Sequence, residues 1–493
     1  MLLVAPIPLL LTPFIIKRVG AEGFGVWAVF LAINGLTSLA DLGFLGTLTK
    51  HISEYFTKRD YLQLNRVINA GLLMFLGVAV ICVAGLNLCS RFLISAFFQH
   101  TSATLPQLQH AVRLLTIAIA FNLLAFPFAS IATGLQRLDF TNLLSALSAM
   151  LMAILAALSL ASGLGIMGLV YSIVLTSGIN LLLYVGIAKR LLPQFRISPS
   201  LIRTEDIRAL FSFSLQIYVT QIAIAVHNQT EKFLLAHFVG LTTVGWYEIA
   251  NDLALKMRGV PSLLLFPLLP ATAELEARAD ESRTSVLYHR THKYLAFLGV
   301  PIIILVWLIA RRFMELWLGP SFSPAASALI VLICAQFFNL TSGPGLFILV
   351  GKGILRPGVR SAVVGIITNL FLSTVLILYF GFTGAVYGTG LSLLIATAYF
   401  MVMFHRETGY PPSSFFGPYL KPLGCGIFLG MVTRQLVPIS QLRWGGLALT
   451  TAIFSFSYGS GLLVLRYFDA FDVQAVERFL PIPKVLRRIA HLA

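Results

Sequence analysis

Charged residues are scarce in this chain of 493 residues: Asp, Glu, Lys and Arg together make up 11%, whereas 58% of the residues are hydrophobic. A soluble globular domain carries about 25% charged residues, so the composition excludes a string of soluble domains. Residues 140–188 and 361–404 contain no charged side chain over 49 and 44 positions. Each of these stretches is long enough for two membrane-spanning helices of about 20 residues. The chain is therefore an integral membrane protein.

Cysteines and catalytic motifs are equally rare. The longest expected outer loop, residues 90–110, holds no Asp or Glu, and the chain has no glycine-rich phosphate loop, nucleophile elbow or zinc motif. We therefore expect no enzymatic activity, no cofactor and no metal. The cysteines lie in apolar stretches without the paired spacing of a metal site, and we interpret them as core residues. They are Cys82, Cys89, Cys334 and Cys425.

Long apolar runs fill most of the chain. They predict helices, because unpaired backbone is costly in lipid and the strands of an outer-membrane barrel would alternate in polarity. We predict an all-α fold with about fourteen transmembrane helices. The first run is short and ends at Lys17 without a small-residue cleavage site, so we expect a shortened helix rather than a signal peptide. The expected spans are residues 2–16, 24–48, 67–89, 111–135, 140–162, 166–188, 209–230, 241–272, 291–313, 323–350, 359–380, 383–404, 419–438 and 444–466.

The distribution of positive charge predicts the orientation. With the N-terminus inside, the cytoplasmic loops and tail hold 24 of the 35 Lys and Arg residues and the outer loops hold 9. This bias favours a protein with both termini in the cytoplasm. We interpret the net charge of +16 as a result of the Lys and Arg residues that set the membrane orientation and attract anionic lipids. We expect no nucleic-acid partner.

One short pattern occurs twice, as KRVGAEGFGVW at 17–27 and HFVGLTTVGWY at 237–247. We interpret it as the outer turn between the first two helices of a repeated bundle, with an aromatic ring at interfacial depth. The offset between the copies begins at 220 and falls only to 216 over six spans, which indicates a duplication. Aligned positions include Gly20 and Gly240, Gly25 and Gly245, Asp60 and Asp280, Asn122 and Asn339, Pro127 and Pro344, and Gly165 and Gly381.

The duplication predicts two six-helix bundles related by a pseudo-twofold axis along the membrane normal, followed by two additional helices, with a central cleft between the bundles. Matching prolines in the two copies, Pro127 and Pro344, predict kinks at which each bundle could bend. The expected division is an N-terminal lobe at 1–195, a cytoplasmic linker at 196–208, a C-terminal lobe at 209–410, and two helices with a basic tail at 411–493.

Four segments carry a family resemblance: TPFIIKRVGAEGFGVWAVF, LADLGFLGTLTKHISEYF, TEKFLLAHFVGLTTVGWYEIAN and FPLLPATAEL. Together they resemble polysaccharide-export proteins of the multidrug/oligosaccharidyl-lipid/polysaccharide (MOP) exporter superfamily, over about residues 1–406. The shortened first helix departs from the family pattern, as does Glu231, where members commonly place an aspartate.

This resemblance implies a flippase that moves an undecaprenyl-pyrophosphate-linked oligosaccharide across the bacterial plasma membrane by alternating access, for cell-surface polysaccharide synthesis. The implied partners are the lipid-linked oligosaccharide itself, a polysaccharide polymerase and a chain-length regulator. Two alternatives stay open: a multidrug or small-solute exporter of the same superfamily, and, with less support, a membrane-embedded glycosyltransferase or polymerase.

Polar residues inside the spans are the candidate site residues, because ionisable groups are costly in the membrane and tend to face a cavity or a partner. Glu248, Asp252 and Lys256 recur every four residues and share one helical face. They could line the cleft or form, with Arg258, an internal network of zero net charge. The cleft candidates are Lys17, Arg18, Asn34, Asp41, Tyr218, Gln221, Asn228, Glu248, Asp252, Lys256 and Arg258, and the coupling-ion candidates are Asp41, His227 and Glu231.

Overall fold

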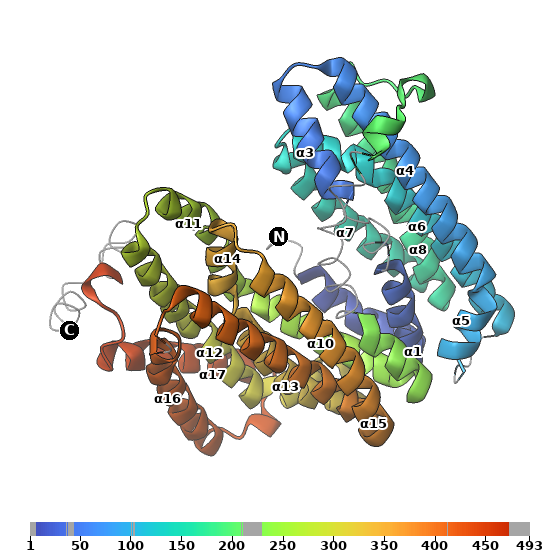
Figure 1. The fold of residues 1–493 in the computed structure, drawn as a ribbon. Helices are drawn as coiled ribbons and strands as arrows, with labels where there is room; N and C mark the ends of the chain where they lie inside the picture. Colours follow the sequence, from blue (N-terminus) through green and yellow to red (C-terminus); the bar gives the residue numbers. More distant parts are fainter. Residues whose placement is uncertain are drawn as a thin grey trace. The chain divides into compact units, whose positions relative to one another are not determined.

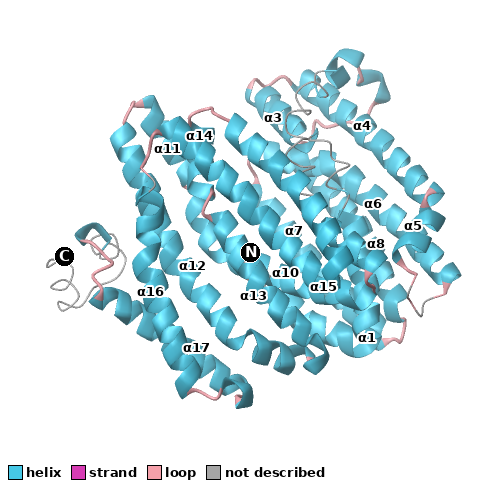
Figure 2. Ribbon diagram, turned by 60° about the horizontal axis from the view of Figure 1, so that its bottom comes forward, coloured by secondary structure: helices cyan, strands magenta, loops and turns pink. Residues whose placement is uncertain are grey.

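The computed structural model describes residues 6–35, 37, 44–99, 101, 104–208, 210, 229–411 and 413–472. Throughout these ranges the regular secondary structure is helical, as Figure 2 shows. Ten helices or helix pairs in the described part are long and apolar enough to cross a membrane. The protein is therefore a multi-pass, all-α membrane protein, as the composition predicts.

The chain divides into two compact units, of which the first comprises Met1–Glu248 and Asn369–Gly388. Within this unit α6 packs against α8, α4 and α3, and α7 packs against α8 and α1, so the helices lie side by side as a bundle (Figure 1). Its helices are α1 (Pro6–Gly35), α3 (Phe44–Thr57), α4 (Tyr61–Leu88), α5 (Ser90–Phe97), α6 (Leu105–Gly134), α7 (Leu138–Ala161), α8 (Gly165–Leu191) and η1 (Pro199–Leu201), together with the helical residues 229–238 and parts of α10 and α15.

The second unit comprises Ile249–Thr368 and Thr389–Ala493. Its longest uninterrupted helix, α12, packs against α16, α13 and α17. The helices that contribute to it are α10 (Leu241–Ser262), η2 (Leu263–Leu265), α11 (Leu268–Ala277), α12 (Glu281–Leu318), η3 (Pro320–Phe322), α13 (Ser323–Leu340), α14 (Gly343–Gly351), α15 (Arg356–Thr408), α16 (Ser413–Leu436), η4 (Ile439–Gln441) and α17 (Trp444–Val464).

Within the described residues the predicted spans correspond to these helices, with interruptions that the apolar pattern did not indicate. Most of the expected span 209–230 lies outside the described residues. The expected span 241–272 contains the short η2 turn between α10 and α11, next to Pro261 and Pro267. The expected span 323–350 is broken at Thr341 and Ser342, directly before Pro344 in the first turn of α14. Proline cannot donate the helical hydrogen bond, which explains why each break lies beside one. The predicted kink at Pro127, by contrast, falls inside the unbroken α6.

The backbone repeats its irregularities at the offsets found in the sequence. Gly20 and Gly240 both have positive φ, as do Gly165 and Gly381. The same is true of the non-glycine pair Arg59 and Ala279. After each member of that pair an aspartate caps the next helix: Asp60 Oδ1 accepts from the Gln63 N–H, and Asp280 Oδ1 accepts from the Arg283 N–H, each at 3.0 Å. Such left-handed positions are uncommon, so their recurrence supports the duplication.

Two asparagines of α4 hold the segment that follows α8. Asn65 Oδ1 accepts from the Arg196 N–H at 2.9 Å, and Asn65 Nδ2 donates to the Gln194 carbonyl at 3.2 Å. One turn later, Asn69 Oδ1 accepts from the Ser198 N–H at 2.8 Å and Nδ2 donates to the Arg196 carbonyl at 2.9 Å. Each amide thus satisfies one donor and one acceptor of an otherwise irregular backbone. The predicted linker begins as a strap fastened to the first unit.

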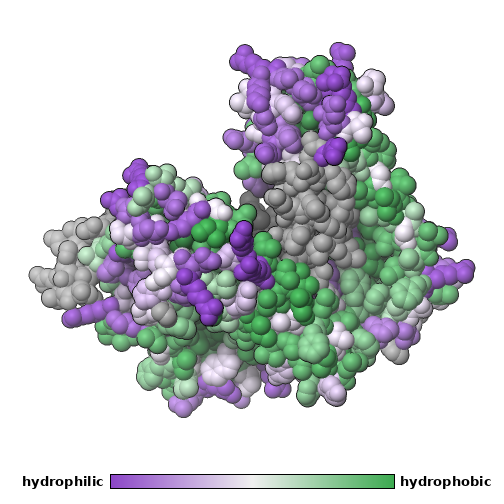
Figure 3. All heavy atoms as spheres, viewed as in Figure 1, coloured by the Kyte–Doolittle hydropathy of each residue, from purple (hydrophilic) through white to green (hydrophobic). Residues whose placement is uncertain are grey.

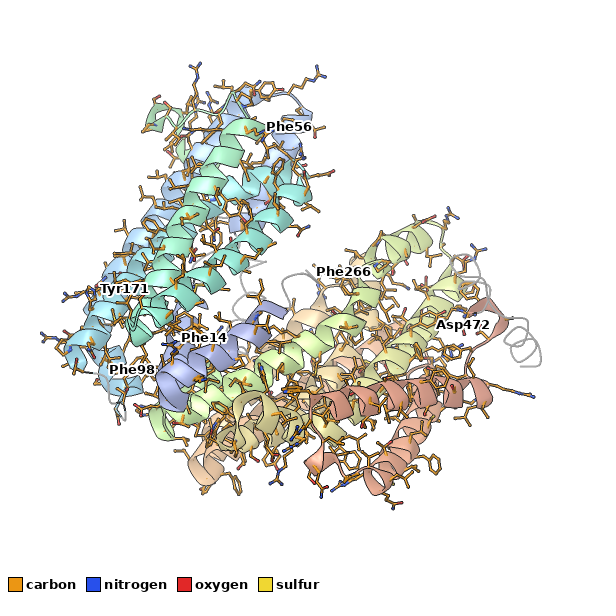
Figure 4. The ribbon with its side chains drawn as sticks, turned by 180° about the vertical axis from the view of Figure 1, so that it is seen from behind. Phe14, Phe56, Phe98, Tyr171, Phe266 and Asp472 are labelled. Carbon is orange, nitrogen blue, oxygen red and sulfur yellow. The ribbon has the colours of Figure 1, made fainter. Side chains whose placement is uncertain are left out.

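Polar and apolar side chains separate along the first unit. Figure 3 shows hydrophilic residues at the end that carries the α3–α4 turn and mostly hydrophobic residues along the flank of α4. Figure 4 places Phe56 at this polar end and Tyr171 and Phe98 at the opposite end. The outward side chains of α4 include Leu73, Val80 and Ile81, which are 45%, 60% and 72% exposed. Exposed aliphatic residues of this number are explained by contact with lipid.

The cysteines do not all belong to the core, contrary to the prediction. Cys425 is buried, whereas Cys89 and Cys334 are exposed and Cys82 is intermediate. In a membrane protein an apolar stretch can face lipid as well as the protein interior, so apolar neighbours in the sequence do not establish burial.

Candidate functional site

Among the predicted site residues that the structure describes, the most deeply buried acid is Glu231, in the first unit. Its side chain is 0% exposed. Its Oε1 atom accepts a hydrogen bond of 2.5 Å from Asn369 Nδ2, and Ser373 Oγ lies 3.4 Å from the same oxygen. Both donors come from α15, one helical turn apart, so α15 presents a short ladder of polar groups to the helical residues 229–238.

The next residue, Lys232, forms a buried ion pair. Its Nζ lies 2.6 Å from Glu248 Oε2, and the two side chains are 7% and 18% exposed. The sequence pattern suggests that Glu248 pairs along its own helix, but the structure shows it pairing with the preceding helical segment. This stretch of the first unit therefore buries two carboxylates, Glu231 and Glu248. Acidic residues buried within the membrane are uncommon and are often functional.

In the second unit, Arg258 is held by two amide side chains of α13. Its Nη1 donates to Gln336 Oε1 at 2.6 Å, and its Nη2 donates to Asn339 Oδ1 at 3.0 Å. Asn339 is oriented in turn by donating to Thr397 Oγ1 at 3.0 Å. No carboxylate in the described part of the chain forms an ion pair with Arg258. The described hydrogen-bond partners of the guanidinium are therefore neutral amide oxygens.

Asp252 and Lys256 form the one pair of the expected helical network that the structure shows among the described residues. Lys256 Nζ bonds to Asp252 Oδ2 one turn away, and the side chains are 32% and 47% exposed for Lys256 and Asp252 respectively. A partly exposed pair of this kind stabilises a helix only weakly. Neighbouring Asn251 is buried, so the polar face of α10 continues inward from the pair.

The remaining described candidates lie in α1. Lys17 and Arg18 are exposed, and the Arg18 guanidinium carbon lies 5.5 Å from the centre of the Phe14 ring, one turn earlier. Asn34 Oδ1 accepts from Asn122 Nδ2 of α6 at a long 3.4 Å. Other predicted candidates lie outside the described residues: Asp41, Tyr218, Gln221, His227 and Asn228.

A polar cluster that the sequence did not indicate joins α12 to the segment after α17. Lys293 Nζ bonds to Asp472 Oδ2, and Tyr294 Oη donates to Asp472 Oδ1 at 2.6 Å. Tyr467 Oη donates to the carbonyl oxygens of Lys293 at 2.7 Å and Pro418 at 2.9 Å. We call residues 467–472 with these partners the C-terminal clasp; Figure 4 labels Asp472 within it.

Sequence signals for the missed partners were present but weak. Lys232 directly follows Glu231 at the end of the expected span 209–230, so the argument that made the acid a candidate applies equally to the base. Asn369 and Ser373 lie four residues apart in the charge-free run 361–404, a spacing that puts both on one helical face. The amides Gln336 and Asn339 had no comparable signal, because three-residue spacing of polar residues is common in helices.

The fold places the chain in a known class: all-α membrane proteins built from two helical bundles. The fold resembles that of the lipid II flippase MurJ in its inward closed conformation, with a TM-score of 0.75 over 93% of this chain and 98% of the other at 11% identity. It also resembles an inward-facing multidrug resistance MATE family transporter, with a TM-score of 0.69 over 82% of this chain and 94% of that chain at 13% identity. Both neighbours have the two-bundle arrangement predicted from the duplication.

Sequence comparison identifies the family. Residues 19–327 match the family described as "Polysaccharide biosynthesis protein", and the chain belongs to this family. It is 24% identical over 392 residues to the probable low-salt glycan biosynthesis flippase Agl15 of Haloferax volcanii, covering 78% of this chain and 77% of the relative. It is 20% identical over 338 residues to the putative O-antigen transporter of Shigella flexneri, covering 66% and 76%. These relatives are named as a flippase and a transporter rather than as enzymes.

Proposed function

We propose that this protein is a flippase for a lipid-linked oligosaccharide, and that the substrate carries its glycan on undecaprenyl pyrophosphate. Family membership and relatives named for glycan flipping and O-antigen transport support the class of substrate. The observation that carries the assignment within this chain is Arg258, a guanidinium fixed by two amide oxygens and without an acid partner in the described residues. A pyrophosphate supplies the charge that this site lacks.

In the proposed anion site, two amide side chains orient the Arg258 guanidinium. Gln336 and Asn339 each accept one N–H of the guanidinium, which leaves Nε and the outward N–H groups for another acceptor. Arg binds phosphate through such parallel N–H groups, which fix geometry as well as charge. The sugars would contact hydroxyl and amide groups of the cleft, and the polyprenyl chain would stay in lipid. Alternating access of the two lobes would then carry the head group across the plasma membrane, with both termini in the cytoplasm.

We propose Glu231 as the site of the coupling ion. Its carboxylate is fully buried, and the donors that contact Oε1 from α15 are neutral. Acidic side chains inside the membrane commonly mark ion and proton pathways in transporters. Glu231→Gln should therefore remove the dependence of transport on the ion gradient, measured in vesicles with a pH gradient or a sodium gradient imposed separately. Unchanged gradient dependence would exclude this role.

The test of the flippase function is the single variant Arg258→Gln. A charge-assisted contact with phosphate contributes about 1.5–3 kcal/mol, so its loss should slow delivery of glycan to the outer face on the order of tenfold or more. A glutamine at this position can still hydrogen-bond to its amide neighbours, so the variant should accumulate normally in the membrane. Delivery is measured by surface labelling of the glycan in cells that depend on the protein.

The matched control removes a cation without removing the proposed anion site. Lys256→Gln combined with Asp252→Asn deletes the neighbouring ion pair at no net change in charge. This double variant should retain most transport. Normal delivery by Arg258→Gln would contradict the phosphate role, and efflux of hydrophobic cations by a protein that delivers no glycan would favour the small-solute exporter.

A further inference from the structure

The repeated motif places two glycines in a reciprocal helix contact within the first unit. Gly25 of α1 faces Leu241, the first residue of α10, so closely that a Cβ atom on Gly25 would overlap the Leu241 carbonyl oxygen. Gly245 of α10 faces Ala21 of α1: a Cβ there would lie 3.4 Å from the Ala21 oxygen. Both Gly25 and Gly245, and both Ala21 and Leu241, are 220 residues apart. Each repeat therefore offers the same surface to the other, as in an isologous interface.

The backbone before each glycine explains how the two helices meet. Gly20 and Gly240 adopt φ values of 74° and 131°, which an ordinary side chain rarely tolerates, and a helical segment starts after each of them. Gly25 and Gly245 then lie in the first turns of these segments. Without side chains, the two backbones can approach to a distance that permits Cα–H contacts to a carbonyl oxygen. The positive ends of two helix dipoles oppose this approach, so other interactions must offset their repulsion.

A second contact between the repeats lies in the same unit. The rings of Phe97 in α5 and Phe233 have centroids 5.0 Å apart, and His237 Nδ1 lies 2.8 Å from the Ala96 carbonyl oxygen. Like the glycine pair, this contact joins residues before position 100 to residues after position 229. Both contacts belong to the face that the charge pattern predicts to be outside.

We infer that the Gly25–Leu241 contact is the closure of the outer face, and that its stability is set by the absence of a single methyl group. This inference rests on the proposed alternating access. The close approach has no room for alanine at position 25, and the obstacle is backbone rather than a movable side chain. The two copies are unequal: at Gly245 the nearest atom to an added Cβ is Phe24 Cδ1 at 3.2 Å, which a small ring movement accommodates. A methyl group at position 25 should therefore separate the two helices, whereas a methyl group at position 245 should not.

The inequality supplies a matched pair of variants, Gly25→Ala and Gly245→Ala. Both add one methyl group to the first turn of a helix, and both gain the same intrinsic helix propensity. The readout is the separation of spin labels at Ser95 and Phe238, two exposed positions beside the Ala96–His237 contact. The labels are introduced as cysteines in a chain whose native cysteines are replaced, and spectra are recorded in lipid nanodiscs.

The wild type and Gly245→Ala should show dipolar broadening from a close pair, and Gly25→Ala should lose most of it. Broadening that persists in Gly25→Ala overturns the inference, and so does an equal loss in both variants. Because the readout is a distance, it is independent of the glycan. Normal transport by Arg258→Gln would contradict the proposed phosphate contact of Arg258. It would not affect the conclusion drawn from the spin-label distances.

A second measurement covers the case in which Gly25→Ala does not accumulate. Phe97→Cys with Phe233→Cys, in the otherwise cysteine-free chain, is bridged by a short bifunctional thiol reagent whose linker contains a disulfide. Bridging should stop glycan delivery, and reduction should restore it. Delivery that continues at the wild-type rate after complete bridging would show that this face does not need to open, and would overturn the inference.

Discussion

Lys232 and Glu248 form an ion pair with Nζ and Oε2 2.6 Å apart, between two helical segments of one compact unit. Both side chains are largely buried, so each charge depends on the other to offset the cost of its burial. Breaking a buried pair from one side leaves an uncompensated charge, whereas replacing both partners by apolar groups is often neutral.

The first prediction follows from this pair. Lys232→Met should destabilise the protein by about 3–5 kcal/mol and lower its thermal unfolding temperature in detergent. The double variant Lys232→Met with Glu248→Leu should recover most of that loss. The control is Glu274→Gln, which breaks the exposed pair with Arg278, 63% exposed on both sides, and should change little. If the double variant is as unstable as the single one, the loss of stability does not come from an unpaired Glu248 carboxylate, and the prediction is wrong.

The strap on α4 gives a second prediction. Asn69→Ala removes the bonds to Ser198 and Arg196, each contributing about 1 kcal/mol, so the strap should open on the order of tenfold more often. Tryptic cleavage after the exposed Arg196 should accelerate correspondingly, measured by the appearance of the two fragments. Asn87→Ala is the control on the same helix, because Asn87 bonds to Val83 and Thr116 and not to the strap. Equal acceleration in both variants would contradict the prediction.

The C-terminal clasp should be sensitive to acid. Burial opposes ionisation of Asp469, but the backbone N–H of Asp472 and the Lys293 and Arg290 cations outweigh it and lower the pKa of Asp469 to about 2. The pKa of an Asp in the unfolded chain is about 3.9. The ionised carboxylate therefore contributes fully to the free energy of unfolding above that pH, and this contribution is lost as the pH falls toward about 2. The difference in unfolding temperature between wild type and Asp469→Asn should be constant at about pH 5–7 and vanish near pH 2. A difference independent of pH would contradict this linkage.

The orientation can be tested with three exposed positions, Ser200, Ser282 and Thr104. In intact cells, cysteines at Ser200 and Ser282 should react only with membrane-permeant thiol reagents, and a cysteine at Thr104 should react with impermeant ones. The physical basis is the excess of Lys and Arg in the loops around Ser200 and Ser282. The reverse pattern at two of the three positions would invert the topology.

The fold was largely predictable from the sequence, and the candidate site only in part. Long charge-free runs leave the backbone little choice but helix, and turns at Gly20, Gly165 and Gly381 were visible because the same pattern recurs at a fixed offset. Glu231 was a candidate from the sequence because it follows an apolar span, and the structure shows that it is buried. Its partner Asn369 was not predictable, because 138 residues separate them and apolar periodicity does not specify which helices become neighbours.

The expected four-residue network on α10 illustrates the same limit. Spacing of four correctly indicates that Asp252 and Lys256 can meet. It cannot show that Glu248 has a partner on another segment, or that Arg258 is satisfied by amides of α13. Local spacing reports which contacts are geometrically possible, and tertiary packing selects among them.

The aligned prolines Pro127 and Pro344 lie at different places in their helices. In the first copy Pro127 lies within the continuous helix α6, where it removes one helical hydrogen bond without ending the helix. In the second copy the break at Thr341 and Ser342 precedes Pro344, and α14 forms a separate piece of nine residues. The Gly351 end of α14 lies against Thr272 of α11. The aligned proline is thus tolerated inside a long helix in the first copy, whereas in the second copy it lies in the first turn of a separate short helix.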